Sequence, residues 1–565
     1  MEADVIVIGA GAGGMAAAVT ARKAGLDVVV LEKADLIGGT TAYSGGVLWV
    51  PCNHHAMASR PGDPAPDNVD AARRYIHEEA GNHGDSARIE TFLEAGPKMV
   101  AFMEKETAVR FYGMDYPDYH TDSPNASTIR SIGTQELRIE ELGLDVRKIR
   151  NQLPQTLFLG LAVGSGVEMM QFMRAGRSIK AMGFVARKLV KHFADLLRYG
   201  EGQQLVRGRA LIARLYKTLC EAGTPVLTNA AVERLIVEDG RVAGVVTRYD
   251  GVETVIHARK AVVLACGGYA NDLKRRLETF PAIVATPAHR NPVPTGNTGD
   301  GIRLAENVGG HFSTDVAEVA AWEPCSVYPG IDGEAGVWPH LVDRQKPGFI
   351  MVLQNGRRFA DESQSYHDLV ARITQACEQQ GYDEACVWMI ADSRAAGRWG
   401  IGRARPFPVP NGSHVRSGYL KKASSVGQLA RQLGIDESQL VETVARFNGF
   451  ARSGIDEDFD RGRTVYDKYQ GEDNCVPNPC LAPLEKGPFY AVKVHSSEIG
   501  TFAGLKTDVN ARVLTEAGDV IAGLYAVGND QASVFAGAYP GAGATLGPGM
   551  TFGYVAARHI AGLPL

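Results

Sequence analysis

The 565-residue sequence lacks the features that mark a disulfide-stabilised or metal-chelating protein. Its eight cysteines show neither the paired short spacings of zinc or iron–sulfur sites nor a CxxCH haem motif. They are Cys52, Cys220, Cys266, Cys325, Cys377, Cys386, Cys475 and Cys480. Scattered cysteines indicate a reducing compartment, and the first residues, MEADVIVIGAG, contain no basic leader. We therefore expect a cytoplasmic protein without a bound metal.

Long apolar runs and a strong excess of charge are also missing. The longest apolar-looking stretch, residues 157–173, contains Glu168 and Gln171. It is shorter than the roughly 20 apolar residues that a membrane-spanning helix needs. A formal net charge of -5 gives no overall attraction to nucleic acid. Membrane-spanning and general nucleic-acid-binding functions are therefore not expected, and any basic patch must be local.

Glycine, by contrast, is abundant, and its first cluster belongs to a nucleotide-binding motif. The β-branched run 4–8 is followed by glycines and by an alanine-rich helix that extends to about Ala24. Glycine in such a turn lets the backbone approach a pyrophosphate at the helix N-terminus, and the last glycine lets helix and strand pack closely. The glycines of this turn are Gly9, Gly11, Gly13 and Gly14.

An acidic residue and a second loop extend the motif. The strand 28–31 ends in Glu32, at a spacing that suits a ribose hydroxyl and disfavours a 2′-phosphate, and Lys33 follows. The next loop is rich in glycine and hydroxyl groups and is placed to meet a cofactor larger than NAD. We therefore predict non-covalent FAD, since no residue is marked for a covalent bond. The predicted contacts in this loop are Gly39, Thr40, Thr41, Ser44, Gly45 and Gly46.

Strand patterns in the rest of the chain indicate pieces of one sheet. Two runs around Asp239-Gly240 form a hairpin signal, the strand 260–265 enters a glycine turn, and so does the strand 523–529. We predict an α/β fold, in which a Rossmann-like FAD-binding domain carries an inserted α+β catalytic domain and an additional helical insertion. The predicted limits are 1–156, 205–295 and 491–565 for FAD binding, 157–204 for the helical insertion and 296–490 for catalysis.

Several motifs carry a family resemblance that covers most of the chain. They are Gly-Arg-Arg-Phe-Ala-Asp-Glu at 356–362, Pro-Asp-Tyr at 117–119, and Tyr-Pro-Gly-Ala-Gly at 539–543, which leads into Thr-Leu-Gly-Pro at 545–548. The sequence resembles flavoproteins related to fumarate reductase and succinate dehydrogenase, and within them the 3-ketosteroid Δ1-dehydrogenases. In fumarate reductases an arginine after the first motif delivers a proton, whereas Tyr366 follows here. A phenol suits a neutral ketone better than a guanidinium does.

The resemblance implies a set of catalytic roles. Tyr366 would remove the proton from carbon 2 of the steroid while flavin accepts a hydride from carbon 1. The Tyr539 hydroxyl and the Gly543 N–H would polarise the 3-keto oxygen, and Tyr119 would favour the Tyr366 phenolate through a hydrogen bond. The implied partners are a 3-ketosteroid and an external electron acceptor. Further predicted FAD contacts are Val232, Gly268, Asn529, Thr545 and Leu546.

Other functions remain open at this stage. A 3-ketosteroid Δ4-(5α)-dehydrogenase or a fumarate reductase-like enzyme would share the fold but arrange its acid–base residues differently. A flavin-binding module without turnover is the alternative from another class. His54, His55 and His367 have no carboxylate or cysteine partner at local ligand spacing, so we predict surface or supporting roles for them.

Residues 157–198 combine apolar side chains at helical spacing with a local excess of cations. We interpret this segment as docking on an anionic membrane surface; the alternative is packing on the protein's own surface or at a subunit contact. The apolar residues are Met182, Val185, Leu189, Phe193 and Leu196, and the cations are Arg174, Arg177, Lys180, Arg187, Lys188, Lys191 and Arg198.

Overall fold

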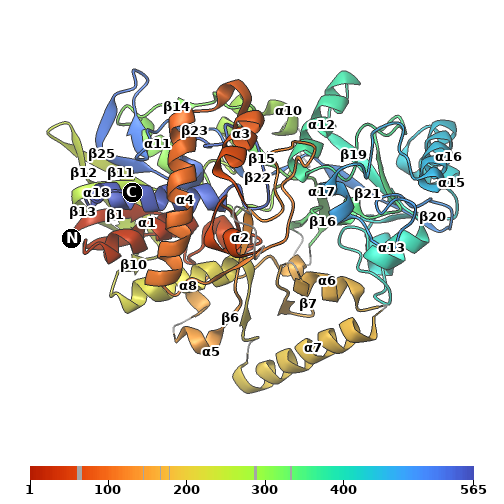
Figure 1. Cartoon of the computed structure of the whole chain (residues 1–565), viewed down its shortest axis with the longest axis horizontal. Coiled ribbons are helices and arrows are strands. Elements are labelled where there is room, and N and C mark those ends of the chain that lie inside the picture. Colours follow the sequence, from red (N-terminus) through yellow and green to blue (C-terminus); the bar gives the residue numbers. More distant parts are fainter. Residues whose placement is uncertain are drawn as a thin grey trace.

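The computed structural model describes residues 1–59, 67–143, 146–165, 167–176, 178–200, 202–284, 289–330 and 334–565. Two sheets dominate it, and in Figure 1 the first lies on the left and the second on the right. The chain visits the first sheet near its N-terminus, again near its middle and finally near its C-terminus. The predicted α/β fold is therefore confirmed.

The first sheet has a parallel centre and an antiparallel hairpin beside it. The parallel strands run in the order β10-β2-β1-β13-β25, and the first half of β13 pairs with the hairpin β11–β12. Apolar strands suit this sheet because both faces of its parallel part are covered. The strands are β1 (Glu2–Ile8), β2 (Val28–Leu31), β10 (Val226–Leu227), β11 (Ala230–Glu238), β12 (Arg241–Tyr249), β13 (Val252–Leu264), β24 (Arg512–Leu514) and β25 (Val520–Ala526).

The predicted hairpin at Asp239-Gly240 is confirmed. Both residues have positive φ angles, 49° and 74°, and the strands pair directly on either side of them. Such a two-residue turn matches the right-handed twist of its strands, and glycine adopts the required conformation without steric cost.

Helices cover the first sheet, and glycines let two of them approach closely. A Cβ on Gly553 of α18 would lie 2.5 Å from the Gly13 carbonyl oxygen of α1, so a larger residue would separate the helices. Their contact brings the C-terminal helix against the predicted phosphate turn. The main helices are α1 (Ala12–Lys23), α3 (Val69–Ala80), α4 (Ser86–Glu106), α8 (Arg207–Glu221), α11 (Asp300–Glu306) and α18 (Leu546–Ile560).

The second sheet has a core on each face. In β18, Phe349 and Met351 pack into one cluster while Ile350 and Val352 pack into the other, as the alternation of a strand requires. Its strands are β16 (Cys325–Pro329), β17 (Ala335–Pro339), β18 (Phe349–Val352), β19 (Cys386–Ala391), β20 (Lys421–Ala423) and β21 (Phe489–His495). Its helices are α12 (Tyr366–Gln379), α13 (Ser393–Trp399), α14 (Gly412–Arg416), α15 (Val426–Leu433), α16 (Glu437–Ser453) and α17 (Val465–Gln470).

Small elements connect the two sheets. Ile302 and Trp322 lie within the range 296–490 predicted for the catalytic domain, but they pack into the core of the first sheet. The domain limits stay a prediction. The connecting strands are β3 (Val47–Trp49), β4 (Phe111–Gly113), β5 (Ser131–Thr134), β6 (Leu137–Arg138), β9 (Gln204–Leu205), β14 (Phe312–Ser313), β15 (Ala320–Trp322), β22 (Glu498–Thr501) and β23 (Gly504–Leu505). The short helices are α2 (His54–Ala58), α5 (Ile139–Leu142), α9 (Leu273–Thr279), α10 (Pro281–Val284), η1 (Gly39–Tyr43) and η6 (Gly528–Asp530).

The segment after residue 156 forms a hairpin and two helices. They are β7 (Leu157–Phe158), β8 (Leu161–Ala162), α6 (Val167–Arg174) and α7 (Ile179–Tyr199), and α7 lies along the lower edge of Figure 1. The long helix expected there is present. Within the described ranges, no helix is both long and apolar enough to cross a membrane.

Candidate active site

The turn after β1 forms a cradle that only glycine permits. Gly9 has φ +110°, and a Cβ there would lie 2.1 Å from the Ala265 carbonyl oxygen. A Cβ on Gly14 would lie 2.2 Å from the Gly9 oxygen, while Gly11 is the N-cap of α1 and offers no side chain to its first N–H groups. Glycine at these positions therefore leaves space at the helix N-terminus, and diphosphate binding there stays a prediction.

Glu32 lies at the C-terminal end of β2 and is held by this turn. Its Oε2 accepts a hydrogen bond from the Ala10 N–H at 3.0 Å, and its Oε1 accepts one from the Ala34 N–H at 2.9 Å. Burial raises its pKa, and these hydrogen bonds oppose the increase. Lys33 turns away from Glu32 and pairs with Thr298 and Asp300.

The second glycine loop packs directly on the first. Thr41 Oγ1 accepts from the Ala12 N–H at 3.2 Å, and Thr40 Oγ1 accepts from the Asn297 amide at 3.1 Å. The Ser44 hydroxyl donates to the Thr41 carbonyl and accepts from the Gly46 N–H. Gly39 begins η1, and the Gly45 carbonyl accepts from Ser165. Two predicted loops, separated by 24 to 37 positions in the sequence, therefore meet at one helix end.

Asp530, which sequence reasoning missed, connects the strand ends on the other side. Its carboxylate accepts from the N–H groups of Cys266 and Gly268 at 2.6 and 2.9 Å, and burial raises its pKa to about 6. Asn529 precedes it in η6, close to Gly268. Val232 lies on β11, and Thr545 and Leu546 start α18. The sequence signal that could have identified Asp530 was its position directly after the predicted FAD contact Asn529.

Three buried tyrosines from distant parts of the chain meet next to this cradle. Tyr119, Tyr366 and Tyr539 are only 5%, 8% and 4% exposed. The Tyr119 and Tyr366 hydroxyl oxygens lie 3.2 Å apart in a hydrogen bond, and every pair of ring centroids lies between 5.3 and 5.7 Å. The structure thus brings together the three phenols that the sequence analysis selected.

Polar networks hold two of these tyrosines in place. Asp118, next to Tyr119, is fully buried and accepts from Trp49, Ser127 and Arg130. The Tyr119 N–H donates to the Pro540 carbonyl, which fixes it to the Tyr539 loop. Tyr366 starts α12, whose N-cap Ser365 accepts from the Asp368 N–H. The positions of both rings are therefore set by backbone contacts.

The motif at 356–362 forms buried ion pairs in the segment that leads into α12. Arg358 forms buried ion pairs with Glu362 at 2.7 Å and Asp456 at 2.8 Å, and Arg461 pairs with Glu362 at 3.0 Å. Arg344 donates to the Gln364 carbonyl at 2.8 Å. Although burial opposes ionisation, the guanidinium groups of Arg358 and Arg461 lower the pKa of Glu362 to about 2. Within the described residues these charges are paired with one another, and Arg358 and Glu362 lie shortly before Tyr366 in the chain.

Burial raises the pKa of all three phenols. The pKa of Tyr366 lies well above its usual value because of desolvation and the nearby Tyr539 and Glu323, while the hydrogen bond from Tyr119 lowers it. The pKa of Tyr119 is also raised, mainly by burial. Burial raises that of Tyr539 too, and hydrogen bonds with Tyr366 and Thr545 oppose the increase.

Gly543 occupies a position where glycine is required. Its φ is +99°, and a Cβ would lie 2.6 Å from the Leu48 carbonyl carbon. Its carbonyl accepts from Trp49 and Gly547. Within the described ranges, its own N–H donates to no protein group, so it is available to a ligand.

Glu323 is a second residue that the sequence did not reveal. It is fully buried, and both carboxyl oxygens lack a hydrogen-bond partner among the described residues. Burial raises its pKa well above the usual value, because desolvation penalises the charged carboxylate. His367 lies nearby in the fold, where its Nδ1 accepts from the Trp322 N–H, and burial lowers its pKa to about 4. The supporting role expected for His367 stays a prediction.

A cavity of about 670 Å³ opens beside Tyr119. Its described lining contains more carboxyl groups than cations, because His120 and Arg372 face five acids. His120 is already paired with Glu79 and Asp368 at 2.5 and 2.8 Å. The acids are Asp122, Glu318, Asp361, Asp368 and Asp467.

The nucleotide cradle, Glu32 and the adjoining buried phenols define an FAD-dependent oxidoreductase. Residues 4–546 match the FAD binding domain family. The chain is 36% identical to a 3-oxosteroid 1-dehydrogenase of Mycolicibacterium smegmatis, covering 99% of this chain and 97% of that protein. The chain belongs to this family of flavin-dependent dehydrogenases.

A second dehydrogenase and a crystal structure are similarly related to this chain. A 4-oxocyclohex-2-ene-1-carboxylate 5-dehydrogenase of Sinomonas cyclohexanicum is also 36% identical, over 99% of this chain and 94% of that protein. The crystal structure of 3-ketosteroid Δ1-dehydrogenase from Sterolibacterium denitrificans, in complex with 1,4-androstadiene-3,17-dione, has a TM-score of 0.91 and 33% identity, with 99% of each chain covered. The similarity extends across both sheets.

Proposed function

We propose that this protein catalyses the FAD-dependent 1,2-dehydrogenation of 3-ketosteroids. The observation that carries the proposal is the hydrogen-bonded pair Tyr119–Tyr366 beside Tyr539, together with the Gly543 N–H, which donates to no group among the described residues. The named steroid dehydrogenases with similar sequence and structure support the same reaction.

The residues present fit FAD. The N-terminus of α1 would hold the diphosphate, Glu32 the ribose hydroxyls, and the loop 39–46 with the start of α18 the flavin. When bound, FAD supplies the acceptor for a hydride. Within the described residues, no cradle side chain lies in a motif for covalent attachment, which supports non-covalent binding.

The chain's own residues would then act on the steroid. The Tyr539 hydroxyl and the Gly543 N–H would donate hydrogen bonds to the 3-keto oxygen, which makes the proton on carbon 2 more acidic. The Tyr366 oxygen would remove that proton, and the Tyr119 hydroxyl would stabilise the phenolate. Burial of all three phenols keeps water away from the reacting atoms.

The cavity favours a neutral ketone over the carboxylated cyclohexane ring named for the Sinomonas relative. Acids outnumber cations in its described lining, and His120 already forms two ion pairs. Burial raises the pKa of Glu318, and that of Asp361 to about 8, so not all of these acids are charged near neutral pH. The described lining still offers a substrate carboxylate few cations beside Tyr119.

Anaerobic mixing of the FAD-loaded protein with a 3-ketosteroid tests the function. We expect the yellow absorbance to bleach, and 4-oxocyclohex-2-ene-1-carboxylate to bleach it far more slowly. Unchanged absorbance with the steroid would favour a flavin-binding module without turnover. Faster bleaching by the carboxylate would assign the protein to the monocyclic keto acids.

We also propose that the protein docks on an anionic lipid surface, and the outward face of α7 supports this. The described outward residues are apolar along the whole helix: Ile179, Met182, Ala186, Val190, Phe193 and Leu197. Ile179 and Leu197 are 85% and 91% exposed. At 100° per residue, the exposed cations Lys180, Arg187, Lys191 and Arg198 form a row along one side of this face.

Several residues expected on that face lie elsewhere. Val185 is buried, and Leu189 and Leu196 are half-buried. Lys188 faces the body of the protein and pairs with Glu136 and Glu168, at 3.1 and 3.2 Å. Asp195 likewise pairs with Arg138. Arg177 lies outside the described residues. The acid of α7, Asp195, and its histidine, His192, are both buried. The outward face therefore combines apolar side chains with cations, which is the pattern of an interfacial helix.

Vesicle co-sedimentation tests the docking. Wild-type protein should bind phosphatidylglycerol vesicles, bind phosphatidylcholine vesicles weakly, and lose binding as salt rises. Val190→Glu with Leu197→Glu should abolish binding, whereas Val252→Glu with Leu273→Glu, at exposed apolar positions elsewhere, should not. Equal binding by both pairs would contradict the proposal, and self-association lost only in the α7 pair would assign the face to a second copy.

A further inference from the structure

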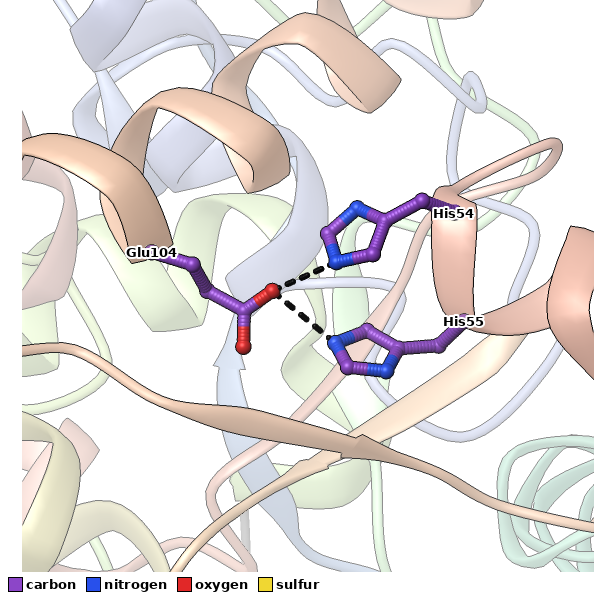
Figure 2. A group of neighbouring side chains, drawn as sticks. All are labelled: His54, His55 and Glu104. Carbon is purple, nitrogen blue, oxygen red and sulfur yellow. Dashed lines mark hydrogen bonds and ion pairs between the residues drawn. The ribbon is translucent and has the colours of Figure 1, made fainter.

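A cluster of two imidazoles and one carboxylate lies outside the site described above. Figure 2 shows His54 and His55 pointing toward the same oxygen of Glu104. The Nε2 atoms of His54 and His55 lie 2.6 and 3.0 Å from Glu104 Oε2. The sequence contains no carboxylate near the histidine pair, so the partner comes from the distant helix α4.

Backbone contacts hold the three side chains in this arrangement. Asn53, which is fully buried, caps α2 by accepting from the His55 and Ala56 N–H groups, and it donates to the Val50 carbonyl. Glu104 Oε1 accepts from the Phe111 N–H at 2.8 Å. One carboxylate oxygen is thus used by the backbone, and the other is directed at the imidazoles.

We propose that His54, His55 and Glu104 bind one Zn²⁺ ion. Neutral imidazole nitrogen and carboxylate oxygen are zinc ligands, and three protein ligands leave a position for water. Zinc bonds of about 2.0–2.1 Å place tetrahedral ligand atoms roughly 3.3 Å apart. The present Nε2–Oε2 distances of 2.6 Å for His54 and 3.0 Å for His55 would have to lengthen by about 0.7 and 0.3 Å. His54, with 49% of its side chain exposed, can move outward.

The bound ion would link the start of α2 to α4. Because α4 also holds the start of β4 through Glu104 and Phe111, three elements would share one fixed point. A ligand that binds only the folded protein raises its unfolding temperature by mass action. Zinc should therefore stabilise the protein without any part in the flavin chemistry.

A second group of ligand-type residues is a weaker candidate. Glu384, Cys386 and His495 also approach one another, but the Lys493 ammonium lies 2.6 Å from Glu384. A cation already occupies this carboxylate. The Cys386 thiol also has a raised pKa because of burial, which opposes the thiolate that zinc requires.

Isothermal titration of the metal-free, FAD-loaded protein with ZnCl₂ tests the proposal. We expect one ion per chain and a higher unfolding temperature in zinc. His55→Ala and Glu104→Gln should each weaken binding on the order of tenfold or more, because each removes a ligand. Flavin absorbance reports that the variants remain folded.

Two control variants distinguish zinc binding at this site from zinc binding to another histidine or to the Cys386 thiol. His83→Ala removes an exposed imidazole that pairs with Asp315, and Cys386→Ala removes the second group's thiol. Both should bind zinc like the wild type. Absence of zinc binding in the wild type, or unchanged affinity in His55→Ala and Glu104→Gln, would show that Glu104 is only a hydrogen-bond acceptor for the two histidines.

Discussion

At the residue scale, the proposed chemistry depends on the oxygen of Tyr366. Replacing Tyr366 with phenylalanine retains the ring, which packs against Tyr119 and Tyr539. It removes the group that would accept the proton, a contribution of about 10²–10⁴-fold to rate. We expect turnover with an artificial electron acceptor to fall by at least about 10²-fold, while FAD content and steroid affinity are retained. Wild-type turnover in this variant would mean that another group is the base.

The pH dependence of turnover follows from the pKa of the same phenol. Burial raises the Tyr366 pKa above its usual value, so the reactive phenolate increases as pH rises. Below that pKa, turnover should increase about tenfold per pH unit if proton removal limits the rate. Tyr119→Phe removes a hydrogen bond that lowers this pKa. Its profile should shift to higher pH and approach the wild-type rate only under more alkaline conditions.

Tyr466→Phe is the matched control for this shift. The Tyr466 ring lies 5.0 Å from that of Tyr119, but its hydroxyl accepts from Gln345 rather than contacting Tyr366. Its pH profile should remain that of the wild type. If the profiles of Tyr119→Phe and the wild type coincided, the Tyr119 hydrogen bond would have no role in ionising the base.

At the scale of elements, His120 links α3 and α12 across the cavity. Burial opposes its charged form, yet hydrogen bonds with Asp368 and Glu79 raise the His120 pKa to about 11. Burial likewise opposes ionisation of Asp368, while His120 lowers the Asp368 pKa to about 2. The stabilisation from His120 is therefore complete below its unfolded pKa, near 6.5, and is lost as pH rises through 11. That from Asp368 is present above 3.8 and is lost as pH falls through 2.

His120→Gln should therefore destabilise the protein most between pH 4 and 6.5. We expect a loss on the order of 1–3 kcal/mol, the range for hydrogen bonds to charged groups, and a smaller loss near pH 11. Thermal unfolding at both pH values measures it. His83→Gln, which removes an exposed pair with Asp315, should have little effect at either pH. A pH-independent loss in His120→Gln would indicate altered packing instead of lost ion pairs.

At the scale of the whole molecule, the cofactor site is assembled from segments near both ends and the middle of the chain. Hydrogen bonds and close packing hold these segments together, so unfolding should release a cofactor that has no covalent bond. Acid precipitation of the purified protein should leave the yellow colour in the supernatant. Colour that stays with the precipitate would contradict non-covalent binding and point to a linked flavin.

The sequence by itself determined the local features of this protein. The strand–turn–helix around Gly9, the position of Glu32, the Asp239-Gly240 hairpin and the helical character of α7 follow from backbone sterics and side-chain periodicity within a few residues. The family resemblance added Tyr119, Tyr366 and Tyr539, which no local pattern distinguishes from the other tyrosines.

Only the tertiary structure decided which distant groups meet. Periodicity shows that α7 is amphipathic, but the ion pairs of Lys188 and Asp195 with the body determine which face is exposed. Glu104 joins His54 and His55, and Asp530 joins Cys266, across dozens to hundreds of positions. That the Glu323 carboxyl group is buried with no hydrogen-bond partner among the described residues is likewise invisible in its neighbours along the chain. Contacts of this kind depend on distances in space, because desolvation and hydrogen bonding act over a few ångströms whatever the separation in sequence.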